Sequence, residues 1–172
     1  IFVKKIEGLS KNFVMGADIS SILSLEESGV VFKNKEGKPA DIFTVLKESG
    51  ITSVRIRVWN NPFDENGRGF GGGNVDIKRA VEIGKRAAKA KMSVMLDFHY
   101  SDFWADPSKQ QAPRAWQGMN TDEKAKALYE YTKESLLYAL SEGVNVAFVQ
   151  VGNETTGTFC GEKNWITIAK LM

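Results

Sequence analysis

The sequence predicts an α/β fold built on a parallel β-sheet, and three observations support this class. Short apolar segments recur along the chain, and each is followed by a polar loop. Each loop leads into a segment whose apolar residues have the spacing of an amphipathic helix. This order of strand, loop and helix is typical of βαβ units, whose strands are parallel. A chain of 172 residues, 42% of them hydrophobic, is also large enough for one domain with a substantial core.

Four apolar segments are expected to form the strands, at residues 13–18, 53–59, 93–99 and 146–154. The last of these is interrupted by Gln150 alone before it ends in Gly152, Asn153 and Glu154. A run of this kind is typical of a parallel strand that is covered on both faces. Ligands of parallel α/β folds bind at the carboxyl ends of the strands, so chemistry is expected at the end of this segment.

The segments between the strands have recognisable helix ends. Helices are expected at residues 22–27, 41–49, 76–91, 120–143 and 164–172. Gly50 and Gly143 favour left-handed caps, and Asn120 with Glu123 forms the pattern of a capping box. The long loops after the strands are expected to form the walls of a cleft.

The charge pattern excludes several classes of partner. With 23 basic and 21 acidic residues interspersed, the chain has no basic stripe for nucleic acid or for an anionic membrane surface. No apolar run approaches the roughly 18 residues of a membrane span, and residues 1–5 lack the apolar core of a signal peptide. The single cysteine, Cys160, excludes an internal disulfide and is expected to be structural.

Strand alternation selects the side chains that meet on one face of the sheet. Arg55 and Arg57 share a face of the second strand, and Asp97 and His99 share a face of the third. Arginines on a buried strand need carboxylate partners, so an ion pair between Arg55 and Asp97 is expected inside the sheet. Arg57 lies nearer the carboxyl end, level with His99 and Glu154, and is expected to belong to the site.

His99 is the only histidine, which argues against two kinds of hydrolytic site. Zinc sites usually take two or three histidines, so no metal is expected. A serine nucleophile is equally unsupported, because the pattern G-x-S-x-G does not occur. His99 is therefore expected to be a hydrogen-bonding partner in a carboxylate site.

Aromatic and polar side chains gather in the loops at the carboxyl ends of the strands. Three tryptophans lie there, Trp59, Trp104 and Trp116. Each either packs in the core or stacks on a flat ligand such as a sugar ring, and stacking is expected for one or two of the three. Three polar residues of the same loops and strand ends are expected to bind substrate, namely Asp18, Asn60 and Asp102.

This combination of side chains fits the hydrolysis of a glycosidic bond. The reaction needs one carboxyl group to protonate the departing oxygen and a second to attack the anomeric carbon. Glu154 is expected to be the proton donor, and the amide of Asn153 beside it is expected to bind the sugar 2-hydroxyl group. The competing interpretation of Glu154 is a salt bridge at the rim of the sheet.

Four motifs in order along the chain resemble glycoside hydrolase family 53, the arabinogalactan endo-β-1,4-galactanases: GADIS at 16–20, VRIRVWN at 54–60, LDFHYSDFWADP at 96–107 and QVGNET at 150–155. The resemblance implies a retaining (β/α)8 barrel with Glu154 as the acid/base and Asn153 as its partner. It makes Arg57 the strand-two arginine that supports the nucleophile, and His99 a site position. The implied substrate is the β-1,4-galactan of pectin side chains, and the implied location is extracellular.

The resemblance also implies that residues 1–172 are a single, truncated catalytic domain, the N-terminal half of the barrel with four βα units. The strand-seven nucleophile, and the calcium site of some family members, would lie in the other half, so no cofactor is expected here. The complete enzyme is expected to be a monomer. This half has open sheet edges, so it is expected to be inactive alone and to self-associate.

Other functions stay open on the sequence. One is a non-catalytic galactan-binding half, in which the three tryptophans and Asp102 keep affinity without turnover. Another is a half that completes a barrel by dimerising or by meeting its own C-terminal half. The third is a related glycosidase that acts on mannan, cellulose or xylan, because Asn-Glu after strand four is shared across the clan.

Overall fold

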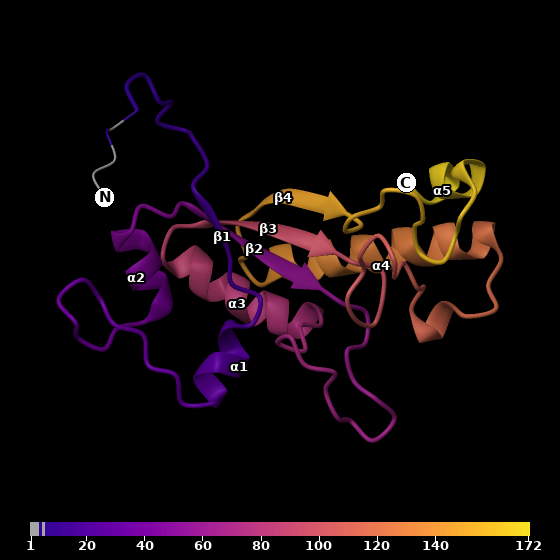
Figure 1. Ribbon diagram of the computed structural model, residues 1–172, viewed down its shortest axis with the longest axis horizontal. Helices are drawn as coiled ribbons and strands as arrows, with labels where there is room; N and C mark the ends of the chain where they lie inside the picture. The colour runs from indigo at the N-terminus through magenta and orange to yellow at the C-terminus, as the bar shows by residue number, and fades with distance from the viewer. Residues whose placement is uncertain (1–3, 5) are drawn as a thin grey trace.

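The computed structural model describes residue 4 and residues 6–172, and its centre is a parallel four-stranded sheet (Figure 1). The strands are adjacent in chain order, β1 (Gly16–Asp18), β2 (Ser53–Val58), β3 (Ser93–Phe98) and β4 (Val146–Val151). The predicted α/β class and parallel sheet are confirmed. Most of the 1–5 segment, where the sequence lacks a signal-peptide core, lies outside the described residues.

The helices occupy the predicted positions to within a few residues. They are α1 (Ile22–Glu27), α2 (Ile42–Glu48), α3 (Ile77–Lys89), α4 (Thr121–Ser141) and α5 (Trp165–Leu171), with a short 3₁₀ turn at Arg114–Trp116. Asn120 and Glu123 form the expected capping box at the start of α4. Within the described residues, none of these helices combines the length and the apolarity that crossing a bilayer requires.

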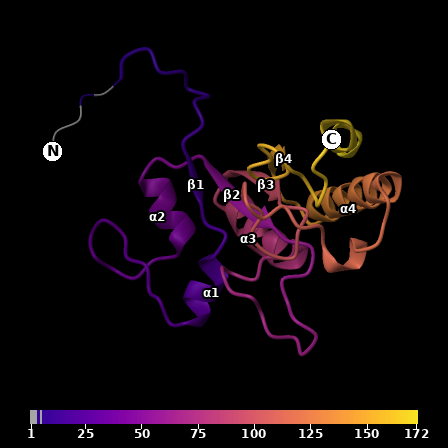
Figure 2. The ribbon, with the colours of Figure 1, turned by 45° about the vertical axis from the view of Figure 1, so that its right-hand side comes forward.

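The core lies between the sheet and α3, which runs beneath β2 and β3 (Figure 2). Val54, Ile56 and Val58 alternate along β2 and are fully buried on the side that α3 covers. Helix α3 packs closely against Val144 because Gly84 has no side chain. A Cβ atom at Gly84 would lie 2.7 Å from a methyl group of Val144, so only glycine fits without displacement.

The prediction that β4 is covered on both faces is wrong. Phe148, Val149 and Val151 are each 38–44% exposed. The physical reason is its position, because β4 lies at one edge of the sheet and pairs with β3 alone. The seven-residue helix α5 packs on α4 rather than across the faces of β4.

The first strand is shorter than the predicted 13–18. Phe13, Val14 and Met15 are 44–50% exposed, and the segment before β1 runs away from the sheet (Figure 1). Its last residue, Met15, still accepts backbone hydrogen bonds from Thr52 and Ser53. Regular pairing with β2 therefore begins only at Gly16.

Cys160 is structural, as expected. The side chain is buried, and burial raises the pKa of its thiol to about 12. A thiol that stays protonated is a poor nucleophile, so Cys160 has the properties of a packing residue.

Candidate active site

The carboxyl end of β4 forms a tight turn that sets Asn153 and Glu154 in place. Gly152 has φ +80°, and a Cβ atom there would lie 2.6 Å from atoms of Phe159 and Thr155. Glu154 also adopts a left-handed conformation, with φ +52°, and is exposed. Left-handed backbone is uncommon outside glycine and tends to occur at functional sites, because the surrounding structure must enforce it.

The side-chain amide of Asn153 has a fixed orientation. Its Oδ1 accepts hydrogen bonds from Arg55 Nη2 at 3.0 Å and from Gln150 Nε2 at 3.3 Å, while its Nδ2 donates to the Ala105 carbonyl at 2.7 Å. An amide nitrogen carries two N–H groups, and among the described residues only Ala105 accepts one. The second N–H of the Asn153 amide therefore has no acceptor within the described part of the chain.

Gln110 holds the same turn from a neighbouring loop and was missed from the sequence. Its Nε2 donates to the Asn153 carbonyl at 2.6 Å, and the side chain is buried. A glutamine in a polar loop carries no pattern that predicts such a contact. Only the folded loop shows that it closes over the end of β4.

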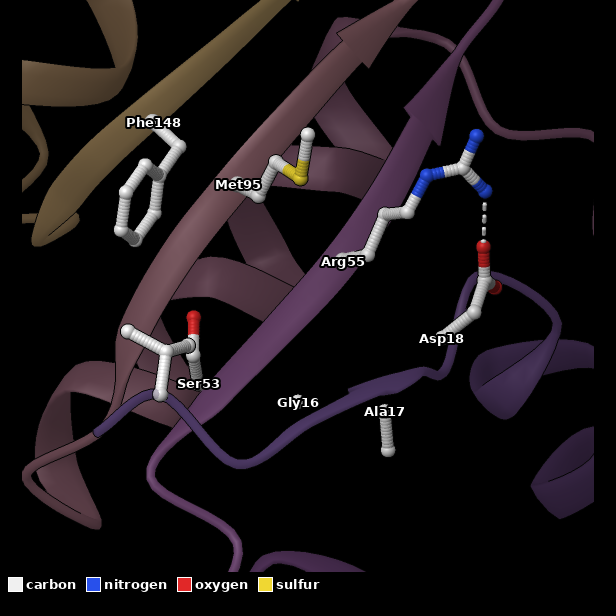
Figure 3. Close-up of a pocket in the computed structure, with 8 residues that line it drawn as sticks. Gly16, Ala17, Asp18, Ser53, Arg55, Met95 and Phe148 are labelled. Atoms are coloured by element: carbon white, nitrogen blue, oxygen red, sulfur yellow. Dashed lines mark hydrogen bonds and ion pairs between the residues drawn. The ribbon is translucent and has the colours of Figure 1, made fainter. Parts of the chain in front are cut away.

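Arg55 is the hub of an ionic network on the face of the sheet that Met95 and Phe148 share, and Figure 3 shows its contact with Asp18. Its Nη1 lies 2.6 Å from Asp18 Oδ2, and its Nη2 lies 2.5 Å from Asp97 Oδ2. The predicted pair of Arg55 with Asp97 is confirmed. The Arg55 side chain is 30% exposed and faces a hollow of about 430 Å³ that is also lined by Met95 and Phe148.

Asp18 is held as an anion beside this network. Burial by itself would raise the pKa of Asp18. Hydrogen bonds from Ser20, the charge of Arg57 and a hydrogen bond from Arg55 outweigh burial, so the pKa is lowered. Both the backbone N–H and the hydroxyl of Ser20 donate to Asp18 Oδ1, at 3.0 and 2.7 Å. The carboxylate is thus oriented as well as charged.

The prediction that Arg57 lies level with His99 and Glu154 is wrong, whereas its support of the nucleophile stays a prediction. The strand register sets Arg57 level with Asp97 and Gln150, and the arginine that contacts Asn153 is Arg55. Arg57 Nε and Nη1 are shielded from solvent and have no hydrogen-bond partner among the described residues. Burial is also the main cause that lowers the pKa of Arg57.

His99 does not face the cleft, so its predicted catalytic role is wrong. The residue is 1% exposed, and its Nδ1 accepts hydrogen bonds at 3.1 Å from Trp59 Nε1 and from the Ala105 backbone N–H. Because Nδ1 accepts, Nε2 carries the proton, and it lies 3.1 Å from Asp97 Oδ2. The expected hydrogen bond to a carboxylate is confirmed, and His99 positions Asp97.

Stacking on a ligand is possible for one of the three predicted tryptophans. Trp59 is 0% exposed and Trp116 is 6% exposed, whereas Trp104 is 41% exposed. The predicted substrate contacts of Trp59 and Trp116 are therefore wrong. Trp59 is enclosed by the edges of His99, Phe103 and Trp104, at centroid distances of 5.0–5.9 Å.

Asp102 also proves to be structural, against the prediction that it binds substrate. Its Oδ1 accepts from the Asn61 backbone N–H at 3.1 Å, and its Oδ2 accepts from the Arg114 backbone N–H and Nε, both at 2.9 Å. The side chain joins two rim loops. Asn60 differs, because its Oδ1 is buried and has no partner within the described part of the chain.

The four βα units and their rim match one family throughout. The family described as "Glycosyl hydrolase family 53" matches residues 14–172. The chain belongs to glycosyl hydrolase family 53.

Relatives with printed names agree with this family 53 assignment. The chain is 56% identical over 171 residues to the endo-β-1,4-galactanase of Bacillus subtilis (strain 168), which covers 99% of this chain and 40% of the relative. It is 42% identical over 139 residues to a probable arabinogalactan endo-β-1,4-galactanase A of Neosartorya fischeri, which covers 81% of this chain and 37% of the relative. The chain thus spans well under half the length of both relatives.

The solved family 53 catalytic domain of Ignisphaera aggregans has the same fold. It superposes with a TM-score of 0.95 at 36% identity, over 99% of this chain and 49% of that domain. The four βα units correspond to the N-terminal half of a family 53 (β/α)8 barrel, as the motifs predicted. Within the described residues no three His, Cys, Asp or Glu side chains are grouped to hold a metal ion.

Proposed function

We propose that this chain supplies the acid/base half of an endo-acting, retaining glycoside hydrolase that cleaves β-1,4-galactan. The observation that carries the proposal is the turn after β4. In it an exposed carboxyl group, Glu154, follows an amide, Asn153, whose orientation is fixed from both sides. Its support is membership of family 53 and the names of the relatives.

Glu154 acts first as an acid and then as a base. It protonates the glycosidic oxygen as the bond to the anomeric carbon breaks, while a second carboxylate attacks that carbon from the opposite side. In the second step Glu154 takes a proton from the water that displaces the second carboxylate, and the two inversions together retain the configuration of the anomeric carbon. The family resemblance assigns the attacking carboxylate to strand seven of the barrel. Two carboxyl groups suffice for this chemistry, and it needs no cofactor.

Asn153 and Arg55 prepare the other side of the reacting sugar. The free N–H of Asn153 donates to the oxygen of the sugar 2-hydroxyl group, a contact that strengthens as positive charge develops on the ring. Arg55 holds the amide in this orientation through Oδ1. Because Arg55 faces the open side of the sheet, its charge also contributes to stabilising an attacking carboxylate.

The substrate runs along the carboxyl rim. Trp104 offers an exposed ring to the apolar face of a galactose unit. Asp18 supplies a polar contact, since its side chain is 35% exposed, and the half-buried Asn60 lies at the same rim. A polysaccharide is too large to cross a membrane unaided, so the complete enzyme works outside the cell. We also propose that the complete enzyme is a monomer.

A chimaeric protein tests the proposal. Residues 1–172 are joined to the part of the Bacillus subtilis relative that follows its matched 171 residues, which supplies a complete barrel. The chimaera is expected to release reducing sugar from linear β-1,4-galactan. Glu154→Gln is expected to lower that rate by about 10²- to 10⁴-fold, because general acid–base catalysis contributes this much.

A matched control is Glu142→Gln, which lies at the end of α4 and pairs with Lys85 far from the turn after β4. It is expected to leave the rate unchanged. A chimaera that folds but hydrolyses mannan, cellulose or xylan in preference to galactan would contradict the proposed substrate. Equal rates for Glu154→Gln and the parent would contradict the role of Glu154.

A further inference from the structure

The guanidinium group of Arg57 lies against the face of the Trp104 ring. The Arg57 Cζ atom is 4.2 Å from the centroid of that ring, within the range of a cation–π contact. Trp104 is nevertheless 41% exposed. One face of the indole is therefore covered by Arg57, and part of the ring remains open to solvent.

Arg57 has few other partners that would explain its place. Its Nη2 is 3.4 Å from Ser21 Oγ and its Nε is 3.7 Å from Asp18 Oδ2, while its Cζ lies 4.2 Å from the Trp104 centroid and 5.6 Å from the Trp59 centroid. Within the described residues Nε and Nη1 make no hydrogen bond. Arg55, two residues earlier on the same strand, has three close partners instead. A buried cation with unpaired N–H groups is costly, and of the two rings that its Cζ faces Trp104 is the nearer, so Trp104 is the aromatic partner that offsets most of this cost.

The rest of the Trp104 surroundings hold the ring from its sides. Trp59, His99 and Phe103 approach at centroid distances of 5.6, 5.8 and 6.5 Å, with interplanar angles of 60–76°. All three rings are steeply inclined to the indole plane, so they pack around it and restrict its sliding. Arg57 supplies the contact on its flat face.

We infer that Arg57 is a positioning residue that fixes the Trp104 ring as a platform for a sugar unit of the substrate. A ring already held in its bound orientation loses less conformational entropy when the ligand binds, so binding is tighter. The inference rests on the proposed function for the identity of the ligand, a β-1,4-galactan chain. The placing of the ring by Arg57 is a property of the protein without ligand.

The first experiment measures the Trp104 ring without any ligand. Trp59 and Trp116 are buried, whereas Trp165 is 68% exposed, so Trp165→Phe leaves Trp104 as the one well-exposed tryptophan of the described chain. Acrylamide is the quencher, because it is uncharged and does not respond to loss of the arginine charge. In this background Arg57→Met is expected to raise the quenching constant of Trp104 about twofold, since an arginine stem and head no longer cover one face.

The matched control is Arg86→Met, which removes another arginine stacked on an aromatic ring. Arg86 Cζ lies 4.9 Å from the centroid of Phe43, on α3 and α2. It is expected to leave Trp104 quenching unchanged. Circular dichroism checks the fold of each variant, and Arg57→Lys, which keeps a charge but not the flat guanidinium, serves if the methionine variant does not fold. Unchanged quenching in the folded Arg57 variant overturns the inference.

The second experiment measures binding of β-1,4-galactotetraose in a double-mutant cycle. Arg57→Met is expected to weaken binding by about two- to tenfold, the cost of ordering one side chain that is no longer held. In a Trp104→Ala background the same substitution is expected to have no further effect, because Arg57 acts through that ring. Equal weakening in both backgrounds overturns the inference.

The two experiments separate this inference from the proposed function. Absence of galactotetraose binding by the parent chain, with increased quenching in Arg57→Met, counts against the proposed ligand and supports the placing of the ring. Binding by the parent with unchanged quenching in Arg57→Met supports the ligand and overturns the role of Arg57.

Discussion

Strands β2 and β4 are both six-residue runs rich in β-branched apolar residues, but they differ in environment. The valines and isoleucine on the helix side of β2 are fully buried, whereas Phe148, Val149 and Val151 of β4 are 38–44% exposed. β2 has a neighbouring strand on each side and α3 beneath it, whereas β4 pairs with β3 alone. An apolar, β-branched run therefore predicts a strand but not its place in the sheet.

The carboxyl ends of the two strands reverse this contrast. The end of β4 is tightly built, with Gly152 and Asn153 buried although the faces of the strand are open. The contacts that fix it come from β2 and from the loop after β3, through Arg55, Ala105 and Gln110. Precise placement of the site thus depends on the interior strands more than on the strand that carries Glu154.

The largest expected effect comes from breaking the link between the strands. Arg55→Met leaves the fully buried Asp97 without its cation, so the free energy of unfolding is expected to fall by about 3–5 kcal/mol. Urea denaturation measures it. Arg79→Met, which breaks an exposed pair with Glu27, is the control and is expected to cost less than about 1 kcal/mol. A loss for Arg55→Met no larger than the control would show that the network does not hold the sheet.

The next effect tests the tight end of β4. Gly152→Ala is expected to cost about 3 kcal/mol, because alanine is strained at φ +80° and its Cβ atom would lie 2.6 Å from Phe159 and Thr155. Gly157→Ala in the same loop meets no atom within 4 Å and serves as the control. Equal unfolding free energies for the two variants would contradict the close packing of this turn.

A pair of valines compares the two strands directly. Val54 of β2 and Val149 of β4 point to the same side of the sheet, and they are 0% and 39% exposed. Val54→Ala is expected to cost about 2 kcal/mol, and Val149→Ala less than about 1 kcal/mol, in proportion to the apolar area removed from water. Chemical denaturation measures both, and similar costs would remove the distinction between interior and edge.

The smallest effect is a dependence of stability on pH. The pKa of Asp18 is lowered in the folded chain, so ionised Asp18 stabilises the fold above its unfolded pKa, near 4. That contribution is lost as the pH falls through the lower folded pKa. Asp18→Asn is therefore expected to be less stable than the parent at pH 7, with a difference that shrinks below about pH 4. A difference that grows on acidification would reverse the assigned direction.

The sequence was informative where local patterns decide the structure. Helix ends, strand parity and the pair of Arg55 with Asp97 follow from capping residues and from the two-residue period of strands. Parity also brought Asp97 and His99 to one face, and the two are hydrogen-bonded. The family motifs then identified the barrel, because they carry information that periodicity lacks.

The predictions that were wrong concern the burial of side chains and the identity of their hydrogen-bond and pairing partners. His99, Trp59 and Trp116 follow strands or lie in loops, and nothing in their order shows that other loops fold over them. Asp102 was expected to be free for a ligand, but it accepts from the Asn61 backbone N–H and from the backbone N–H and Nε of Arg114, in two separate loops. Arg57 was expected level with His99 but pairs with Asp97, two residues earlier on β3, because the strand register is set by pairing and not by position within the strand.

The dependence on the leaving group tests the central claim, that Glu154 is the acid/base, most directly. The chimaera carrying Glu154→Ala is compared with its parent on β-1,4-galactan and on a dinitrophenyl β-galactobioside, whose leaving group departs without protonation. The claim predicts a loss of about 10²- to 10⁴-fold on galactan, with a rapid initial burst of dinitrophenolate retained, because only bond cleavage in the polysaccharide needs the acid. Equal loss of the burst and of galactan hydrolysis would contradict it.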